Sequence, residues 1–238
     1  MPGFRAHITG SSIVGATYGA AAWYVGEMPP LTCGLAATLC SVAGLMPDLD
    51  SGPGVPLRES VAFAAAVVPM MLLHRMHAAG LPIEGIIVIG AAMYLAIRFG
   101  LDRLLKNYSV HRGMFHSLPA AIIAGQIAFI AFGSEDPMRR YFIASAVVLG
   151  FLTHLILDEI WSVKLGLFGP KVKKSFGTAM KFHGPVAWAN MLTYLIVVIL
   201  GAVAASDAAW SERVASVRQQ TEQASRQLYQ YPQPWVRR

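Results

Sequence analysis

Residues 141 to 160 read YFIASAVVLGFLTHLILDEI, an apolar run that carries a histidine and an aspartate near its end. About twenty such residues are enough to cross the hydrocarbon core of a bilayer as one helix. An ionisable side chain inside such a segment is costly unless it is paired or bound to a metal ion. The apolar run therefore predicts a membrane span, and His154 and Asp158 predict a functional site at the end of that span.

The rest of the chain has the same apolar character. Of its 238 residues, 55% are hydrophobic and 13% are charged, against about 25% charged in an ordinary soluble domain. This composition excludes soluble, disordered and fibrous classes. Counting the run above, the chain has seven candidate spans: residues 8–26, 31–46, 60–79, 83–99, 118–133, 141–160 and 186–205. We predict an all-α, polytopic transmembrane helical bundle of six or seven spans, with the first span retained.

The basic residues set the predicted orientation. With the N-terminus in the cytoplasm, eleven basic residues lie on the inner side and three on the outer side, the latter being Arg75, Arg139 and Arg140. Such a bias in short loops is the positive-inside rule. We therefore expect a multi-pass protein of the bacterial cytoplasmic (inner) membrane, with its C-terminal tail outside.

The composition changes at about residue 206. We expect residues 1–205 to form the transmembrane domain and residues 206–238 to form a polar, helical tail. Seven residues of the tail follow the 3.5-residue period of a helix seam: Trp210, Val214, Val217, Thr221, Ala224, Leu228 and Tyr231. The seam is compatible with a helix on the membrane, with packing on the bundle, or with a homo-oligomer formed through the tail.

The polar residues in or beside the apolar runs are grouped. On the predicted topology they all reach the cytoplasmic face, and they are His7, Asp48, Asp50, His111, His116, His154 and Asp158. Independent core histidines would have no reason to share one face. We therefore predict that these seven residues are the ligands of one metal cluster.

The spacing of these residues supports a shared cluster. His154 and Asp158 are four residues apart, so on a helix both side chains point the same way. Asp48 and Asp50 follow a proline that ends a helix, and a loop would bring His111 and His116 together. Such a donor set fits one or two divalent ions, zinc first, with manganese or magnesium as alternatives.

Other residues that could carry chemistry are assigned to structural roles. His74 and His77 are predicted on the opposite side, and His183 stands alone among basic residues. Cys33 and Cys40 lie in an apolar run and are interpreted as small buried hydrophobes. The sequence contains no HExxH, GxSxG or P-loop motif, so zincin protease, serine hydrolase and nucleotide-binding functions lack support.

The order of the motifs resembles a known family. An N-terminal histidine, PDLD at 47–50, HRGMFHS at 111–117 and HLILD at 154–158 are similar to the YdjM-like family of metal-dependent hydrolases of the bacterial inner membrane. Met114 and Phe115 stand where the family usually has Phe or Leu and then Thr, so a hydroxyl beside the second histidine is missing. The family more distantly resembles the zinc-dependent phospholipase C and single-strand nuclease group, which implies phosphoester chemistry.

The resemblance implies roles for particular residues. By carry-over the seven residues of the cluster are metal ligands, and Asp50 and Arg112 are the candidate catalytic residues. Residue chemistry, apart from the resemblance, adds that the charged fork of Arg112 would hold a phosphate oxygen. Lys173 and Lys174 would either attract an anionic headgroup or serve only as a positive-inside topology signal.

We expect membrane lipids as partners, a phospholipid or lipid phosphate as substrate, and no nucleic acid. The alternatives are a metal-ion transporter or sensor, and a non-catalytic membrane scaffold.

Overall fold

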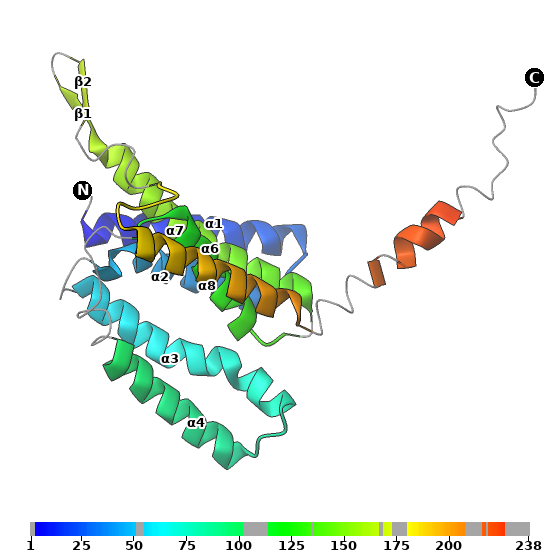
Figure 1. Ribbon diagram of the computed structural model, residues 1–238. Helices are drawn as coiled ribbons and strands as arrows, with labels where there is room; N and C mark the ends of the chain where they lie inside the picture. Colours follow the sequence, from blue (N-terminus) through cyan, green and yellow to red (C-terminus); the bar gives the residue numbers. More distant parts are fainter. Residues whose placement is uncertain are drawn as a thin grey trace, which may run out of the picture.

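The computed structural model describes residues 3–50, 55–101, 114–134, 136–166, 169–172, 180–207, 216–217 and 219–226. Within these residues the chain forms a bundle of long helices (Figure 1). Their bounds are α1 Phe4–Val25, α2 Pro30–Ala43, α3 Val55–Ala78, α4 Ile83–Leu95, α6 Leu118–Ala131, α7 Pro137–Ser162 and α8 Ala187–Ala205. Each coincides with one predicted span, so the predicted helical membrane bundle is confirmed.

Several of the helices have the length and apolarity to cross a membrane. Among the described residues the suitable segments are Pro30–Asp48, Arg58–Ala78, Ile83–Gly100, Pro137–Ser162 and Ala187–Ala205, and α6 is a shorter apolar helix. Helices satisfy their own backbone hydrogen bonds, which is why apolar segments in lipid adopt them. A 3-10 helix, η1 (Met46–Asp50), follows α2, and a π-helix, η2 (Ala96–Leu101), follows α4.

Small residues bring the central helices α1, α2 and α7 close together. A Cβ atom added at Gly15 of α1 would lie 2.6 Å from the carbonyl oxygen of Ala37 in α2, and one at Gly150 of α7 would overlap the carbonyl oxygen of Cys40. Close approach through small residues is a general way for helices to associate in membranes. Cys33 and Cys40 are buried free cysteines in this contact, as the sequence predicted.

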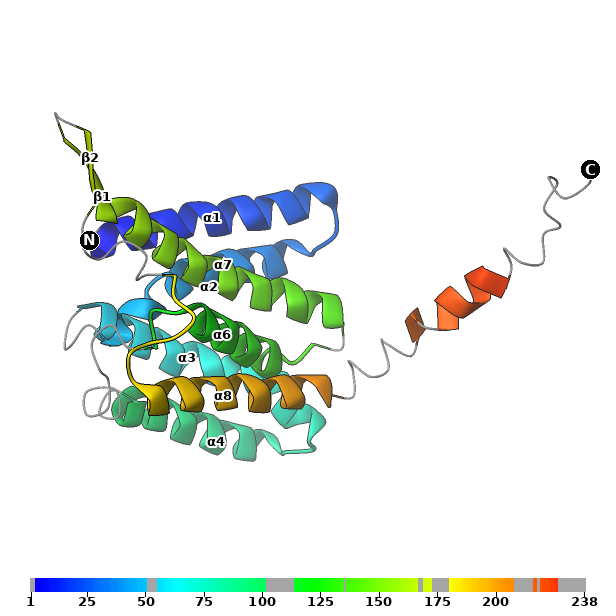
Figure 2. The same ribbon diagram turned by 45° about the horizontal axis from the view of Figure 1, so that its top comes forward.

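Successive helices run in opposite directions, so each end of the bundle collects alternate helix termini. Figure 2 shows the start of α1, the end of α7 and the start of α8 at one end, with the C-terminal segment leaving from the other. We call the first the cluster end, because the predicted donors belong to it. The tail is helical over residues 219–226, and the domain boundary at 205 stays a prediction.

A short hairpin follows α7 and was not expected. Strand β1 (Val163–Gly166) pairs antiparallel with β2 (Gly169–Val172), with Gly166 opposite Gly169 at the turn, and the hairpin projects beyond the bundle in Figure 1. The alternation of apolar and polar residues in VKLG (163–166) is a strand pattern that the search for apolar spans overlooked.

The opposite end of the bundle is held by ion pairs. The buried guanidinium of Arg140, in the first turns of α7, donates two hydrogen bonds of 2.8 and 3.1 Å to Asp207, which follows α8. Arg75 of α3 donates a further one of 2.9 Å to the same carboxylate. Arg140 also donates to the carbonyl of Phe129 and lies over its ring. These contacts connect α3, α6, α7 and the end of α8, and we call them the arginine latch.

Candidate metal centre

Five of the predicted donor residues meet at the cluster end. They come from four separate parts of the chain: His7 from α1, Asp48 from η1, His116 from the segment before α6, and His154 and Asp158 from α7. The three histidines and Asp158 are buried, and Asp48 is partly buried. Side chains are described for five of the seven predicted ligands, and these five converge as the sequence pattern predicted.

The pair on α7 lies one helical turn apart and faces the same way. The Nε2 atom of His154 is 3.7 Å from Oδ2 of Asp158. The other ring nitrogen, Nδ1, lies 2.7 Å from the carbonyl oxygen of Gly44 at the end of α2. Because a carbonyl oxygen only accepts, Nδ1 carries the proton and the lone pair of Nε2 faces the cluster. A carbonyl or carboxylate that orients a histidine in this way is typical of metal-ligating histidines.

Asp48 closes the cluster from the α2 side. Its Oδ1 atom is 3.6 Å from Nε2 of His154 and 3.6 Å from Nε2 of His116. His116 in turn is 3.9 Å from Oδ2 of Asp158. The prediction that Pro47 ends the helix is wrong, because α2 already ends at Ala43. Pro47 and Asp48 both lie in the 3-10 helix Met46–Asp50, which carries the carboxylate toward α7. Asp48, His116 and His154 thus form a group of three donors within 4.8 Å of one another, and Asp158 lies beside its two histidines.

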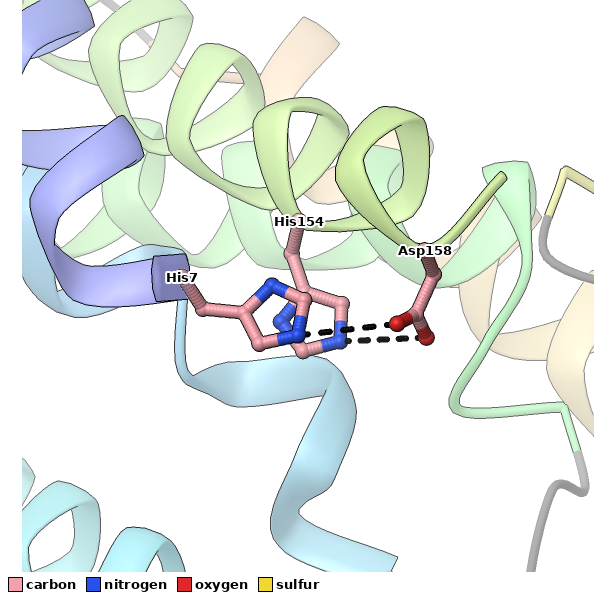
Figure 3. Close-up of side chains that lie close together, drawn as sticks. All are labelled: His7, His154 and Asp158. Carbon is pink, nitrogen blue, oxygen red and sulfur yellow. Dashed lines mark ion pairs between the residues drawn. The ribbon is translucent and has the colours of Figure 1, made fainter. Parts of the chain in front are cut away.

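His7 approaches from α1 and stacks on His154. Figure 3 shows the two imidazole rings nearly parallel, each with its Nε2 atom toward a different oxygen of Asp158. The ring centroids are 3.7 Å apart at an interplanar angle of 13°, and Nε2 of His7 is 3.5 Å from Oδ1 of Asp158. One turn along α1, the buried Ser11 hydroxyl contacts the carbonyls of His7 and Ser41, both at 2.8 Å. Ser11 therefore holds the histidine-bearing turn against α2.

The donor distances fit a bound cation better than direct hydrogen bonds. Hydrogen bonds between nitrogen and oxygen span about 2.7–3.2 Å, whereas the nitrogen-to-oxygen distances in the cluster are 3.5–3.9 Å. Two ligands at ~2.1 Å from a tetrahedral ion lie ~3.4 Å apart. The buried atoms His154 Nε2 and Asp158 Oδ1 make no hydrogen bond within the described part of the chain. Two overlapping groups, His7–His154–Asp158 and Asp48–His116–His154, have the residue types and spacing for a divalent ion.

Other predicted site residues fall outside the described structure. His111, Arg112, Lys173 and Lys174 are outside the described residues, and of Asp50 only the backbone, at the end of η1, is described. Their assigned roles stay predictions. His74 and His77 are exposed near the end of α3 away from the cluster, and His183 is exposed before α8. His74 and His77 thus lie away from the candidate ligands, as predicted, and the assignment of His183 to a surface role stays a prediction.

Two supporting groups were not identified from the sequence. Ser117 accepts a hydrogen bond from the backbone N–H of Ala120 at 3.3 Å and so caps α6, while the N–H of Leu118 donates to the carbonyl of Lys181. Together they fix the segment that carries His116. The signal was available, because serine followed by Pro119 marks a helix start. The role of the Gly44 carbonyl could not have been identified from the sequence, because every residue carries a backbone carbonyl.

Comparison with known proteins gives one match. A model of the YdjM inner membrane protein family matches residues 1–218, which is nearly the whole chain and includes all the candidate ligands. Searches of curated proteins and of solved structures found no match.

Proposed function

The chain belongs to the YdjM inner membrane protein family, and from that premise and the donor cluster we propose that it is a membrane-embedded, metal-dependent hydrolase of a phosphoester. The observation that supports the proposal is the convergence of His7, Asp48, His116, His154 and Asp158 from four parts of the chain. Buried carboxylates with no cation nearby would be costly, so a cluster of this kind implies a positively charged occupant.

A divalent ion at such a site acidifies water and stabilises negative charge on a phosphoryl oxygen. The chain's own contribution is to hold the ligands in place. Gly44 fixes the His154 ring, Ser11 holds the start of α1, and the capped start of α6 holds His116. Zinc suits the mixed histidine and aspartate donors best, with manganese or magnesium as alternatives.

The depth of the cluster favours a lipid phosphate as substrate. Trp161, in the last turn of α7, and Trp188, in the first turn of α8, are both exposed at the cluster end. Tryptophan concentrates where the hydrocarbon meets the headgroups. Asp158 is three residues from Trp161, or about 4.5 Å along the helix axis. The cluster is thus expected at headgroup level, where a lipid phosphate arrives without leaving the membrane.

Three further assignments belong to this proposal. Arg112 would bind a phosphate oxygen with its planar guanidinium, Asp50 would act in proton transfer, and Lys173 and Lys174 would attract the anionic headgroup. Arg112→Lys keeps the charge but removes the two-pronged geometry. It should therefore lower turnover more than substrate binding.

The second candidate function is metal transport or sensing. Transporters hold their substrate ions near the bilayer midplane, at breaks in helices. The cluster instead lies at the helix ends, beside the first turns of α1 and the last turns of α7. This position favours hydrolysis over passage, and it also disfavours a scaffold, which needs no convergent donors.

The test is hydrolysis by the purified full-length protein in detergent or nanodiscs. Phosphatidic acid, a polyprenyl phosphate and a nucleotide would be assayed with added zinc, manganese or magnesium, and with a chelator. We expect release of phosphate or headgroup that the chelator abolishes and that His154→Ala removes. His183→Ala changes an exposed histidine at the same end and should retain activity. Equal rates with and without chelator, or full activity of His154→Ala, would refute the proposal.

A further inference from the structure

The carboxylate of Asp158 divides the cluster into two sets of donors. Its Oδ2 atom faces His116 and His154, and its Oδ1 atom faces His7 (Figure 3). We infer that the cluster binds two divalent ions bridged by Asp158, one held with Asp48, His116 and His154 and the other with His7. This inference rests on the proposed metal site but assigns the ligands to separate ions.

The first set contains the three-residue group Asp48, His116 and His154, to which Oδ2 of Asp158 adds a fourth donor atom beside the two histidines. Each of the Nε2 atoms of His116 and His154 lies 3.6–3.9 Å from both Asp48 Oδ1 and Asp158 Oδ2. The two rings meet edge to face, with centroids 5.6 Å apart at 67°, so their ring planes cross. Crossing ring planes allow both nitrogen lone pairs to point at one ion. Four such donors satisfy the usual coordination number of zinc.

His7 does not fit this first group. An imidazole nitrogen binds a metal ion through a lone pair in the plane of its ring. The rings of His7 and His154 are stacked, with an interplanar angle of 13°, and both Nε2 atoms point toward Asp158. Their lone pairs therefore run side by side and do not converge. His7, His154 and Asp158 lie close enough together for one ion by distance alone, but one ion cannot lie in both ring planes, so the two histidines serve different ions.

The spacing of the stacked rings agrees with two ions. Ions in two-metal hydrolytic sites are about 3.5–4 Å apart. The centroids of His7 and His154 are 3.7 Å apart, and the two oxygens of Asp158 present one acceptor to each ring. The Oδ1 atom makes no hydrogen bond within the described residues, which leaves its lone pairs available to the second ion.

The two ions are expected to differ in affinity. The first has four donors among the described residues, and the second has His7 and one oxygen of Asp158. The second ion should therefore bind more weakly and be the easier one to remove with a chelator. It would also have more coordination positions open to substrate or water, which is what a two-metal mechanism needs from one of its ions.

The alternative role for His7 is to position Asp158 through a hydrogen bond around a single ion. The two roles differ in what a glutamine at this position does. The amide of His7→Gln can still donate to Asp158 but lacks the imidazole lone pair. A positioning role predicts that His7→Gln keeps all the metal, whereas a ligand role predicts that one equivalent is lost.

The experiment is a manganese titration of the full-length protein in detergent, after the purified protein has been stripped with chelator. Bound metal is counted by mass spectrometry, and electron paramagnetic resonance detects coupling between neighbouring Mn²⁺ ions. We expect two equivalents per chain and a coupled spectrum in the wild type. His7→Ala and His7→Gln should each bind one equivalent with an uncoupled spectrum. His74→Ala, an exposed histidine at the opposite end, should keep two.

Thermal unfolding of each variant confirms that it is folded before metal is counted. One equivalent in the folded wild type, or two in folded His7→Gln, would overturn the two-ion assignment. Failure of the hydrolase proposal gives a different result. Two coupled ions with no hydrolysis of any phosphoester would refute the proposed function alone, and metal-dependent hydrolysis with one ion would refute the two-ion assignment alone.

Discussion

The two ends of the bundle both bury charged side chains, but they do so in different ways. In the arginine latch, Arg140, Arg75 and Asp207 make hydrogen bonds of 2.8–3.1 Å. At the cluster end the corresponding distances are 3.5–3.9 Å, and the buried atoms His7 Nδ1, His154 Nε2 and Asp158 Oδ1 make no hydrogen bond within the described part of the chain. In the latch the opposite charges pair directly, although the buried Nε of Arg75 makes no hydrogen bond within the described residues. The cluster is spaced for an ion between its members, and this difference separates a structural ion pair from a binding site.

Removing the shared carboxylate should have the largest effect. Asp158→Asn takes away the carboxylate that both stacked histidines face and that belongs to both donor sets. Loss of an outer partner of a metal ligand already costs about 10–100-fold in affinity, so we expect a loss of more than ~100-fold here. Metal content by mass spectrometry after dialysis tests this. If Asp158→Asn kept the metal content of the wild type, the cluster end would not differ from the latch as a metal-binding site.

Removing the charge of Asp207 from the arginine latch should lower the stability of the protein without changing its metal binding. Asp207→Asn leaves the guanidinium of Arg140, only 1% exposed, without its charged partner. Breaking a fully buried pair costs about 3–5 kcal/mol, but the Asp207 side chain is 16% exposed and that of Arg75 is 32% exposed. We therefore expect a loss of about 2 kcal/mol in the free energy of unfolding, measured by denaturant titration in detergent. Reduced metal content in this variant would show that the two ends are coupled.

Crowding the contact between α2 and α7 should affect both ends of the bundle. Gly150→Ala places a methyl group against the backbone carbonyl of Cys40, so the helices must move apart. Overpacking of this kind costs about 1–3 kcal/mol. The same movement should lengthen the bond from His154 to Gly44 and weaken metal binding by several-fold. Gly34→Ala, in α2 with open space around it, is the control. Equal stability of the two variants would contradict the close packing.

The smallest expected effect is a pH dependence confined to the latch. The hydrogen bond from Arg140 and the charge of Arg75 hold the pKa of Asp207 below its ordinary value. A carboxyl with a lowered folded-state pKa contributes stability that is present above its unfolded pKa of ~3.9 and is lost as the pH falls through the folded pKa. The difference in melting temperature between wild type and Asp207→Asn should be constant near neutral pH. It should shrink below pH ~4, and a constant difference down to pH 2 would contradict the assignment.

Much of the architecture was predictable from local sequence. Hydrophobicity over about twenty residues decides whether a segment enters the bilayer, and a segment in lipid must be helical to satisfy its backbone. Each of the seven predicted spans accordingly coincides with a helix, and among the described residues five of them coincide with segments long and apolar enough to cross a membrane. The alternation of helices then places His7, Asp48, His116, His154 and Asp158 at one end, because each stands at the appropriate end of its own span.

The sequence by itself determined the class of protein, the membrane spans, the family and the donor types, because hydropathy and residue identity are local properties. The tertiary structure alone decided which donors face which. The stacking of His7 on His154, the bond from His154 to the Gly44 carbonyl and the ion pair between Arg140 and Asp207 join residues far apart in the chain. Such contacts depend on how closely small residues let the helices approach, and on backbone groups that every residue shares. No local pattern encodes them, and they distinguish the candidate metal site from the latch.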